Sequence, residues 1–449
     1  MVGLCSSRVR SAAAWFAQVV TLPCHWSQIR VSRCRAFLEC GVALTKRSIA
    51  LWGLLLLVQN QRVLSSTADW PGLWGPSRDG ATSGRLTALR GETEVLWRRP
   101  VAGGYSEIAI HAGRAFTMEL RDGADSIVAL DAATGREHWR VRIGPTYRGH
   151  GGSDDGPIST PAVDGHDLFA LGPHGHLIAV DVTTGRERWR HDLVTAFGAA
   201  APTWGFAASP LIEGRLVIVP TGGPNSKGLL AFDRATGRLA WNVAVAKATA
   251  YSSAVSATIG GIRQVIAVAS DRVFAVAPAD GQVLWNAPGP GGNIEVSNSA
   301  LALPGERLLL SNWEESVMIG ISRRDGAFSA REIWRSPRLR ASNGPTIYRG
   351  GFLYGFAGPM LICMNAETAE VRWRERTGAG TLIAVGDQLV VLGQDSGELL
   401  IATVSPAAFT LRHRARVLET GIRAVTGPSF AGGRLYVRNL KEITALRVN

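Results

Sequence analysis

The sequence predicts an all-β fold, an eight-bladed β-propeller of four-stranded antiparallel blades, and three observations lead to it. A tryptophan preceded by a turn signal recurs from Trp97 to Trp373, over 276 residues in six steps, a mean of 46. Short runs of small polar residues alternate with these tryptophans. The chain ends on an incomplete repeat, while its first tryptophan strand has no repeat before it. Periods of about 40–50 residues with β character are typical of propeller blades.

Each tryptophan follows a turn that runs from an aspartate to a glycine. In the first complete copy, Asp131 ends an apolar strand, Gly135 follows it, and Trp139 lies in the next strand. The aspartate side chain can hold the turn, and glycine supplies the positive φ of a tight hairpin. A large flat indole suits the contact between adjacent twisted blades. We expect a degenerate eighth copy near residues 411–413.

Small polar residues open the strand that follows each tryptophan. The innermost strand of a propeller blade lines a narrow axial channel, where small side chains fit and bulky ones do not. Each repeat is therefore predicted to run from an inner strand through two middle strands to an outer tryptophan strand. The eight openings are Ser106, Ser159, Ala208, Ser252, Asn298, Asn343, Gly380 and Thr426.

The last repeat lacks its outer strand. After the opening at Thr426, apolar strands are predicted at 435–437 and 443–446, and the sequence then stops. The segment 94–98, around Trp97, is an outer strand without a blade of its own. We predict that it completes the last blade, because such closure removes two exposed sheet edges. Residues 90–449 then form one ring with no second domain, and residues 69–89 lead into it.

The positive charge lies mostly at the beginning of the chain. The net charge is +12, but residues 1–68 hold eight basic residues and one acidic residue, so +7 belongs to them and +5 to residues 69–449. A folded part with so small an excess of positive charge is a poor match for nucleic acid. We therefore expect no nucleic-acid partner.

Residues 42–68 have the three-part pattern of a secretory signal peptide. Two basic residues precede an apolar run at 49–58, and small residues mark a cleavage site after Ala68. The run is short of the roughly 20 residues that a membrane-spanning helix needs, and an uncleaved membrane anchor stays open as the alternative. We expect residues 1–41 to be an upstream extension. The mature chain is expected to be a monomer in the periplasm or outside the cell, with no transmembrane span.

Export would leave one cysteine, Cys363, because the other four lie before residue 42. One cysteine cannot form an internal disulfide or a Cys-x-x-Cys metal site. Its apolar surroundings in the sequence predict a buried core thiol.

The repeats resemble the pyrroloquinoline-quinone-like (PQQ-like) β-propeller family of exported bacterial proteins. The opening segment 70–80 is similar to the family's W-P-x-x-x-G-P-x-R-D-G pattern, and the D-x-x-T-G-x-x-x-W blade repeats and the stretch 204–210 are similar to the family as well. The resemblance covers about residues 69–449. It implies the fold strongly and the function weakly, because the family includes both quinoprotein dehydrogenases and an outer-membrane assembly factor.

A quinoprotein dehydrogenase would hold PQQ over a calcium ion, with several oxygen ligands near the axis and a carboxylate base. Glu107 is the only acid at the eight openings, and the vicinal cysteine pair of many such enzymes is missing. Residues 149–156 lack the spacing of a calcium loop, and His174 and His176 lack a third zinc ligand. We therefore expect no catalytic residue, no metal site and no cofactor, with a PQQ- and calcium-dependent alcohol or sugar dehydrogenase as the alternative.

The sequence is thus interpreted as a binding or assembly platform in the cell envelope, with a protein partner or a small ligand at the mouth of the ring. Core packing stays open as the other interpretation of each residue proposed for that mouth. The residues proposed to bind there are Trp204, Phe206, Tyr251, Asn298, Trp313 and Asn343.

Overall fold

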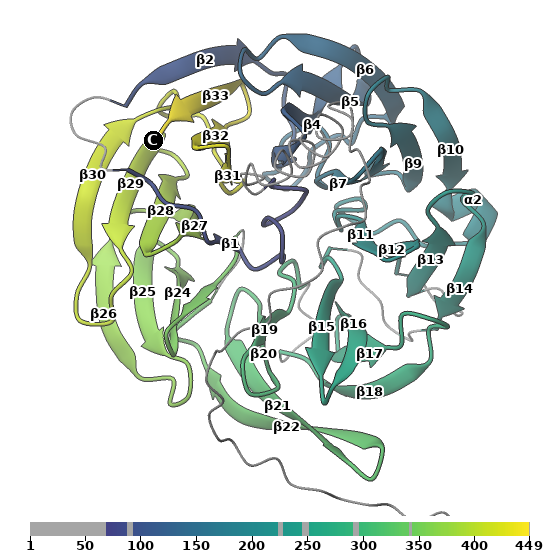
Figure 1. Ribbon diagram of the computed structural model, residues 1–449, viewed down its shortest axis with the longest axis vertical. Helices are drawn as coiled ribbons and strands as arrows, with labels where there is room; N and C mark the ends of the chain where they lie inside the picture. The colour runs from purple at the N-terminus through teal and green to yellow at the C-terminus, as the bar shows by residue number, and fades with distance from the viewer. Residues whose placement is uncertain are drawn as a thin grey trace, which may run out of the picture. The chain divides into compact units, whose positions relative to one another are not determined.

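Eight blades of four antiparallel strands form a closed ring (Figure 1), and one of them carries an added fifth strand, which confirms the predicted eight-bladed propeller. The computed structural model describes residues 69–87, 93–222, 228–244, 251–290, 296–340 and 344–448. The predictions for residues 1–41, for the signal peptide at 42–68 and for Asn343 lie outside the described residues. No helix within the described ranges is long and apolar enough to cross a membrane.

The blades are numbered in chain order, and each is given from its inner to its outer strand. Blade 1 consists of β3 (Ala109–His111), β4 (Arg114–Arg121), β5 (Ala124–Asp131) and β6 (Glu137–Pro145). Blade 2 consists of β7 (Ala162–Asp164), β8 (Asp167–Leu171), β9 (His176–Asp181) and β10 (Glu187–Asp192), and the short helix α2 (Leu193–Phe197) follows it. Blade 3 consists of β11 (Leu211–Glu213), β12 (Leu216–Pro220), β13 (Leu229–Asp233) and β14 (Leu239–Val243). Blade 4 consists of β15 (Val255–Ile259), β16 (Ile262–Val268), β17 (Arg272–Val276) and β18 (Val283–Pro288).

The second half of the ring repeats this order. Blade 5 consists of β19 (Leu301–Leu303), β20 (Arg307–Ser311), β21 (Ser316–Arg324) and β22 (Ala327–Ser336). Blade 6 consists of β23 (Ile347–Arg349), β24 (Phe352–Ala357), β25 (Met360–Asn365) and β26 (Val371–Arg376). Blade 7 consists of β27 (Gly380–Val385), β28 (Gln388–Gly393), β29 (Glu398–Thr403) and β30 (Thr410–Arg416). Blade 8 consists of β31 (Ser429–Ala431), β32 (Arg434–Arg438), β33 (Glu442–Arg447) and β2 (Val95–Pro100).

Apolar contact between neighbouring sheets forms the core. Phe116 and Ile127 of blade 1 pack in one cluster with Leu168 and Ile178 of blade 2, and all four side chains are fully buried. The middle strands are apolar on both faces because each sheet is covered on both sides. The outer strands are largely exposed. Cys363 in β25 is fully buried, as predicted.

The ring closes where the sequence predicted. Strand β2 pairs antiparallel with β33, and Trp97 lies opposite Ala445. The segment that begins the ring therefore supplies the outer strand of its last blade (Figure 1).

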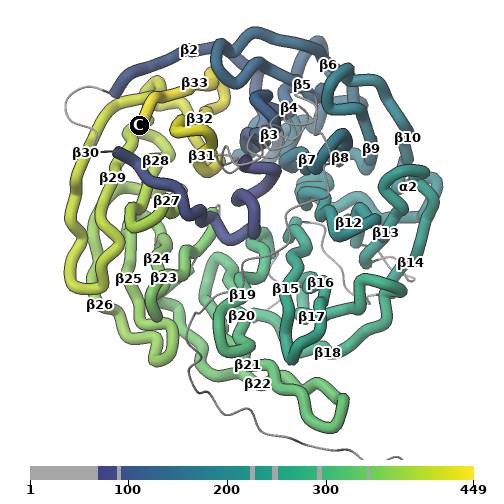
Figure 2. The backbone as a smooth tube through the Cα atoms, in the orientation of Figure 1, coloured from purple at the N-terminus to yellow at the C-terminus, as the bar shows by residue number. Residues whose placement is uncertain are grey.

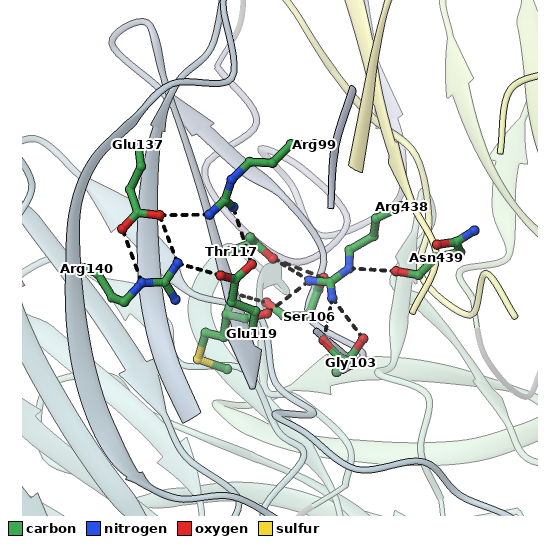
Figure 3. Close-up of polar contacts among 11 residues, drawn as sticks. Arg99, Gly103, Ser106, Thr117, Glu119, Glu137, Arg140, Arg438 and Asn439 are labelled. Atoms are coloured by element: carbon green, nitrogen blue, oxygen red, sulfur yellow. Dashed lines mark hydrogen bonds and ion pairs between the residues drawn. The ribbon is translucent and has the colours of Figure 1, made fainter. Parts of the chain in front are cut away.

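Two arginines of blade 8 bind blade 1 across this closure (Figure 3). Arg99 in β2 forms ion pairs with Glu119 at 3.3 Å and Glu137 at 2.8 Å. Arg438 in β32 is buried and donates to Oγ1 of Thr117 at 2.7 Å. It also donates to four backbone carbonyls, those of Gly103, Gly104, Ser106 and Met118. Burial lowers the pKa of Arg438 to about 10.

The tryptophan of one blade also contacts the turn of the next blade. The indole nitrogens of Trp139 and Trp189 donate to the carbonyls of Val182 at 3.1 Å and Arg234 at 2.9 Å. The turn glycine lies against the ring, since a Cβ added to Gly185 would lie 2.7 Å from Trp139. Glycine is thus required both by its positive φ, +71° at Gly185, and by the close approach of the indole.

Blade 7 has a histidine where the other blades have tryptophan. His413 lies opposite Ile401 beside a β-bulge, as Trp373 lies opposite Cys363 beside a bulge in blade 6. It is buried, and its Nε2 is 2.7 Å from the hydroxyl of Thr93. This is the degenerate eighth copy expected near residues 411–413.

Candidate functional site

The segment 69–87, the lead-in segment, crosses the centre of the ring (Figure 2, purple). Trp70 is fully buried and exchanges backbone hydrogen bonds with Ile110 of blade 1. Strand β1 (Ala81–Thr82) then pairs in parallel with β27 of blade 7, as a fifth strand on the inside of that sheet. The channel is therefore occupied by the chain's own opening motif.

Arg78 anchors the middle of the lead-in segment to the far side of the channel. Its guanidinium donates to the carbonyl of Ala254 at 3.0 Å, to that of Ser209 at 3.3 Å, and to that of Pro210. These carbonyls belong to the inner openings of blades 3 and 4. One side chain thus ties the lead-in segment to two blades.

The small polar openings bond to one another from blade to blade. The amide of Glu107 donates to Oγ1 of Thr160, the amide of Thr160 to Oγ of Ser209, and the amide of Ser209 to Oγ of Ser253, at 2.8–2.9 Å. Between blades 7 and 8, Thr381 donates through its hydroxyl to the carbonyl of Thr426 at 3.1 Å. At the openings of blades 2, 3 and 4, a short hydroxyl side chain thus satisfies the backbone amide of the preceding opening, which accounts for small polar residues at these places.

Glu107 closes this series between blades 8 and 1 and also binds the lead-in segment. One carboxylate oxygen accepts from the amide of Gly427 at 3.1 Å, and the other accepts from the amide of Trp74 at 3.0 Å. Burial raises the pKa of Glu107 to about 7, and the two backbone hydrogen bonds offset part of that rise. The single acid among the openings therefore holds three segments of chain together.

A cavity of about 460 Å³ lies above this layer, on the face where each outer strand connects to the next inner strand. None of the residues that line it belongs to a strand. Aromatic rings surround it from three of these connections, from the lead-in segment and from the turn between β20 and β21, with hydroxyl and amide side chains between them. The aromatic residues are Trp74, Tyr105, Trp204, Tyr251 and Trp313.

Four of the residues predicted for the mouth line this cavity: Trp204, Tyr251, Asn298 and Trp313. Phe206 does not lie with them. Its side chain is 0% exposed and packs against Phe169 and Val217 in the core between blades 2 and 3. The direction of the chain after Trp204 decides this, because the amide of Phe206 bonds back to Pro173. Asn343 lies outside the described residues.

The loops around the cavity are tied together by side chains that the sequence analysis did not single out. The hydroxyl of Tyr105 donates to Asp154 at 3.0 Å, and Arg423 forms an ion pair with the same carboxylate. On the other side, His150 stacks on Trp204, with ring centroids 4.4 Å apart. Trp74 stands at an unspecified position of the W-P-x-x-x-G motif, and Tyr105 and Arg423 belong to no repeat, so no sequence signal indicated these three residues.

A second cavity, of about 630 Å³, lies at the opposite face of the ring between the lead-in segment and blades 1 to 4. Its acids are paired. Asp69 contacts Nδ1 of His111 at 2.7 Å, and Glu213 contacts Arg263 at 2.8 Å. The lead-in segment therefore separates two cavities, one on each face.

Three acids that could serve a PQQ and calcium site, Glu107, Asp154 and Asp155, are already bound by other groups of the protein. No group of three or more His, Cys, Asp or Glu side chains in those ranges could hold a metal. Both oxygens of Glu107 already accept backbone amides, and Asp154 is bound by Tyr105 and Arg423. In the loop 149–156, Asp155 accepts from Gly149 and pairs with Arg148.

Comparison with known proteins places the chain among propellers of two kinds. Residues 123–355 match the family described as outer membrane protein assembly factor BamB. No curated protein matches the sequence. Similar solved structures include BamB from Moraxella catarrhalis, with a TM-score of 0.59 and 17% identity over 80% of this chain and 98% of that one.

The other similar structures include dehydrogenases. The quinohemoprotein alcohol dehydrogenase from Comamonas testosteroni has a TM-score of 0.63 and 13% identity over 86% of this chain and 82% of that one. A europium-containing methanol dehydrogenase has a TM-score of 0.59 and 12% identity over 85% of this chain and 91% of that one. At these identities the likeness establishes the fold alone.

Proposed function

Because the chain belongs to the PQQ-like β-propeller family, we propose that it is a non-catalytic binding platform of the bacterial cell envelope. The family described as outer membrane protein assembly factor BamB matches 233 of the chain's 449 residues. The protein is exported, and it binds its partner or ligand in the cavity at the mouth of the ring. The observation that carries this proposal is the aromatic cavity itself, at the face where propellers commonly bind ligands.

The exposure of Trp313 supports a binding role for the mouth. This side chain is 55% exposed, more than any other large apolar side chain in the described ranges. The turn that carries it is rigid, because the side chain of Asn312 accepts from the amides of Glu314 and Glu315 at 2.9 Å. An exposed indole on a hydrogen-bonded turn, at the rim of a cavity, is more typical of a binding surface than of packing.

The chemistry of Glu107 supports the absence of catalysis. A dehydrogenase base must reach the proton of its substrate. The carboxylate of Glu107 is buried, and its oxygens accept the amides of Trp74 and Gly427. It therefore serves to join the lead-in segment to the ring.

The test of catalysis is reconstitution of the full chain with PQQ and Ca²⁺. We expect no saturable quinone absorbance and no dye-linked oxidation of alcohols or sugars. A stoichiometric bound quinone with turnover would overturn the proposal in favour of a quinoprotein dehydrogenase.

The test of the binding surface compares capture from envelope extracts by the parent chain, by Trp313→Ala and by Val283→Ala. Val283 is 47% exposed on the outer strand β18 and serves as the matched control. We expect material that the parent and Val283→Ala retain and that Trp313→Ala loses. Equal retention by all three would locate binding away from the mouth.

A further inference from the structure

We propose that the ligand of the mouth cavity is a neutral carbohydrate, a short stretch of glycan held against the aromatic rings. This inference rests on the proposed binding function and names the chemical class that the cavity fits. It is drawn from the lining residues, the hydroxyl groups at the floor and the state of the nearby charges.

The floor offers hydroxyl groups that the protein does not use fully. Thr426 is 6% exposed, and its Oγ1 is buried without a hydrogen-bond partner among the described residues. The hydroxyls of Thr160, Ser209 and Ser253 each accept one backbone amide, and no described residue accepts their protons. A buried hydroxyl without a partner costs free energy, and rotation of the Thr426 side chain toward the cavity that the residue lines would let a ligand oxygen recover it.

The walls offer flat apolar surfaces from separate loops. Trp204 is backed by His150, and its amide donates to the hydroxyl of Tyr251 at 3.0 Å, so the loops that carry these rings are fixed relative to each other. Trp74 forms part of the floor and Trp313 part of the rim. A pyranose ring has apolar C–H faces and a hydroxylated edge, which matches aromatic walls above a hydroxylated floor.

The two charged side chains that line the cavity in the described part of the chain, Glu107 and Arg423, already have protein partners. Arg423 is paired with Asp154, and the carboxylate of Glu107 is bound by two backbone amides. Among the described residues that line the cavity, Arg423 is the one cation, so an anionic ligand would have to compete with Asp154 for it and would lie near Glu107. A cationic ligand would have to compete with those backbone amides. A neutral ligand avoids both costs.

A peptide fits the cavity less well. Peptides are commonly held by main-chain hydrogen bonds along a strand edge, and no lining residue of this cavity lies in a strand. The inner edge of blade 7 is already covered by β1 of the lead-in segment. The polar groups that remain are side-chain hydroxyls and amides, which suit the scattered hydroxyls of a sugar.

The experiment is calorimetric titration of the full chain with three soluble hexasaccharides, built from β-1,4-linked N-acetylglucosamine, β-1,4-linked glucose and α-1,4-linked glucose. We expect saturable binding of at least one of them. Trp313→Ala should lower its affinity about three- to tenfold, the value of one aromatic contact. Thr426→Val, which removes only the unpaired hydroxyl, should lower it about three- to tenfold as well.

Two controls keep the test specific. Val283→Ala removes an exposed apolar side chain on an outer strand, and Thr444→Val removes a buried, unpaired hydroxyl in β33. Neither residue lines the cavity, so both variants should bind like the parent. Loss of binding in Thr426→Val but not in Thr444→Val would assign the effect to the cavity rather than to folding.

Three outcomes would overturn the inference. No saturable binding of any of the three glycans would do so, and so would binding that Trp313→Ala and Thr426→Val leave unchanged. Capture of a protein that depends on Trp313, with no glycan binding, would make a polypeptide the ligand and would leave the proposed binding function intact. Turnover with PQQ and Ca²⁺ would instead remove the proposed function itself.

Discussion

The indole nitrogen of Trp97 donates a hydrogen bond of 3.1 Å to the carbonyl oxygen of Ala132. That carbonyl also accepts from the hydroxyl of Tyr436 at 3.0 Å. Trp97 and Tyr436 belong to blade 8, and Ala132 lies in the turn between β5 and β6 of blade 1, so two strands of the last blade hold a turn of the first. The stability of the ring should therefore depend on this junction.

Trp97→Ala should lower the free energy of unfolding by about 3–5 kcal/mol, because it removes a buried indole from the closing strand. Urea denaturation followed by circular dichroism measures the effect. Trp313→Ala is the matched control and should change stability by less than about 0.5 kcal/mol, since that indole is largely exposed. Similar losses in both variants would contradict a special role for the closing strand.

Gly135→Ala should destabilise the ring more than Gly123→Ala. Both glycines have a φ of +72°, so both substitutions carry the same backbone strain, about 1–2 kcal/mol. A Cβ at Gly135 would lie 2.7 Å from the ring of Trp97, whereas nothing lies within 4 Å at Gly123. The difference between the two, about 1–3 kcal/mol, measures the indole contact alone. Equal unfolding midpoints would show that strain accounts for the whole effect.

Arg438→Met should lower the free energy of unfolding by at least about 3 kcal/mol, because five acceptors of the closing junction lose a charged donor. Thermal and urea unfolding measure the loss. Arg416→Met is the control, because Arg416 lies exposed on the outer strand β30 and should tolerate the change. A stable Arg438→Met variant would mean that packing alone closes the ring.

Stability should fall as the pH rises through about 7. Burial raises the pKa of Glu107 and of Asp125 to about 7, so the native state binds more protons than the unfolded state between their ordinary values and that pH. The contribution of each group is fully present at low pH and is lost as the native carboxyl ionises. Urea midpoints at pH 5, 6, 7 and 8 measure the slope.

Glu107→Gln should flatten this pH profile in part, and the double variant with Asp125→Asn should flatten it further. In the single variant Asp125 still titrates, so comparing the single with the double variant separates the contribution of Glu107 to the pH profile from that of Asp125. A Glu107→Gln profile that keeps the full slope of the parent would place the titration elsewhere.

Residues close together in the sequence could be interpreted correctly from the sequence alone. The turn from Asp131 to Gly135 depends on side-chain hydrogen bonds within three residues, since Asp131 accepts from the amide and hydroxyl of Thr134 at 2.8 Å. Because such turns recur at regular intervals along the sequence, their number predicts the number of blades. The predicted strand around Trp97 had no blade of its own, and the last blade lacked its outer strand. Pairing the two removes both free edges.

The sequence by itself therefore determined the fold, the number of blades and the closing strand, because these follow from local turn chemistry and from edges that must be paired. Only the tertiary structure decided which side chains share the cavity. Trp204 and Phe206 are two residues apart, yet one lines the cavity and the other is buried in the core. Glu107 contacts Gly427, which is 320 residues away in the sequence, and no periodic pattern predicts this particular contact. Such contacts depend on where the ring brings separate loops together, which is a property of the folded chain and not of any short segment.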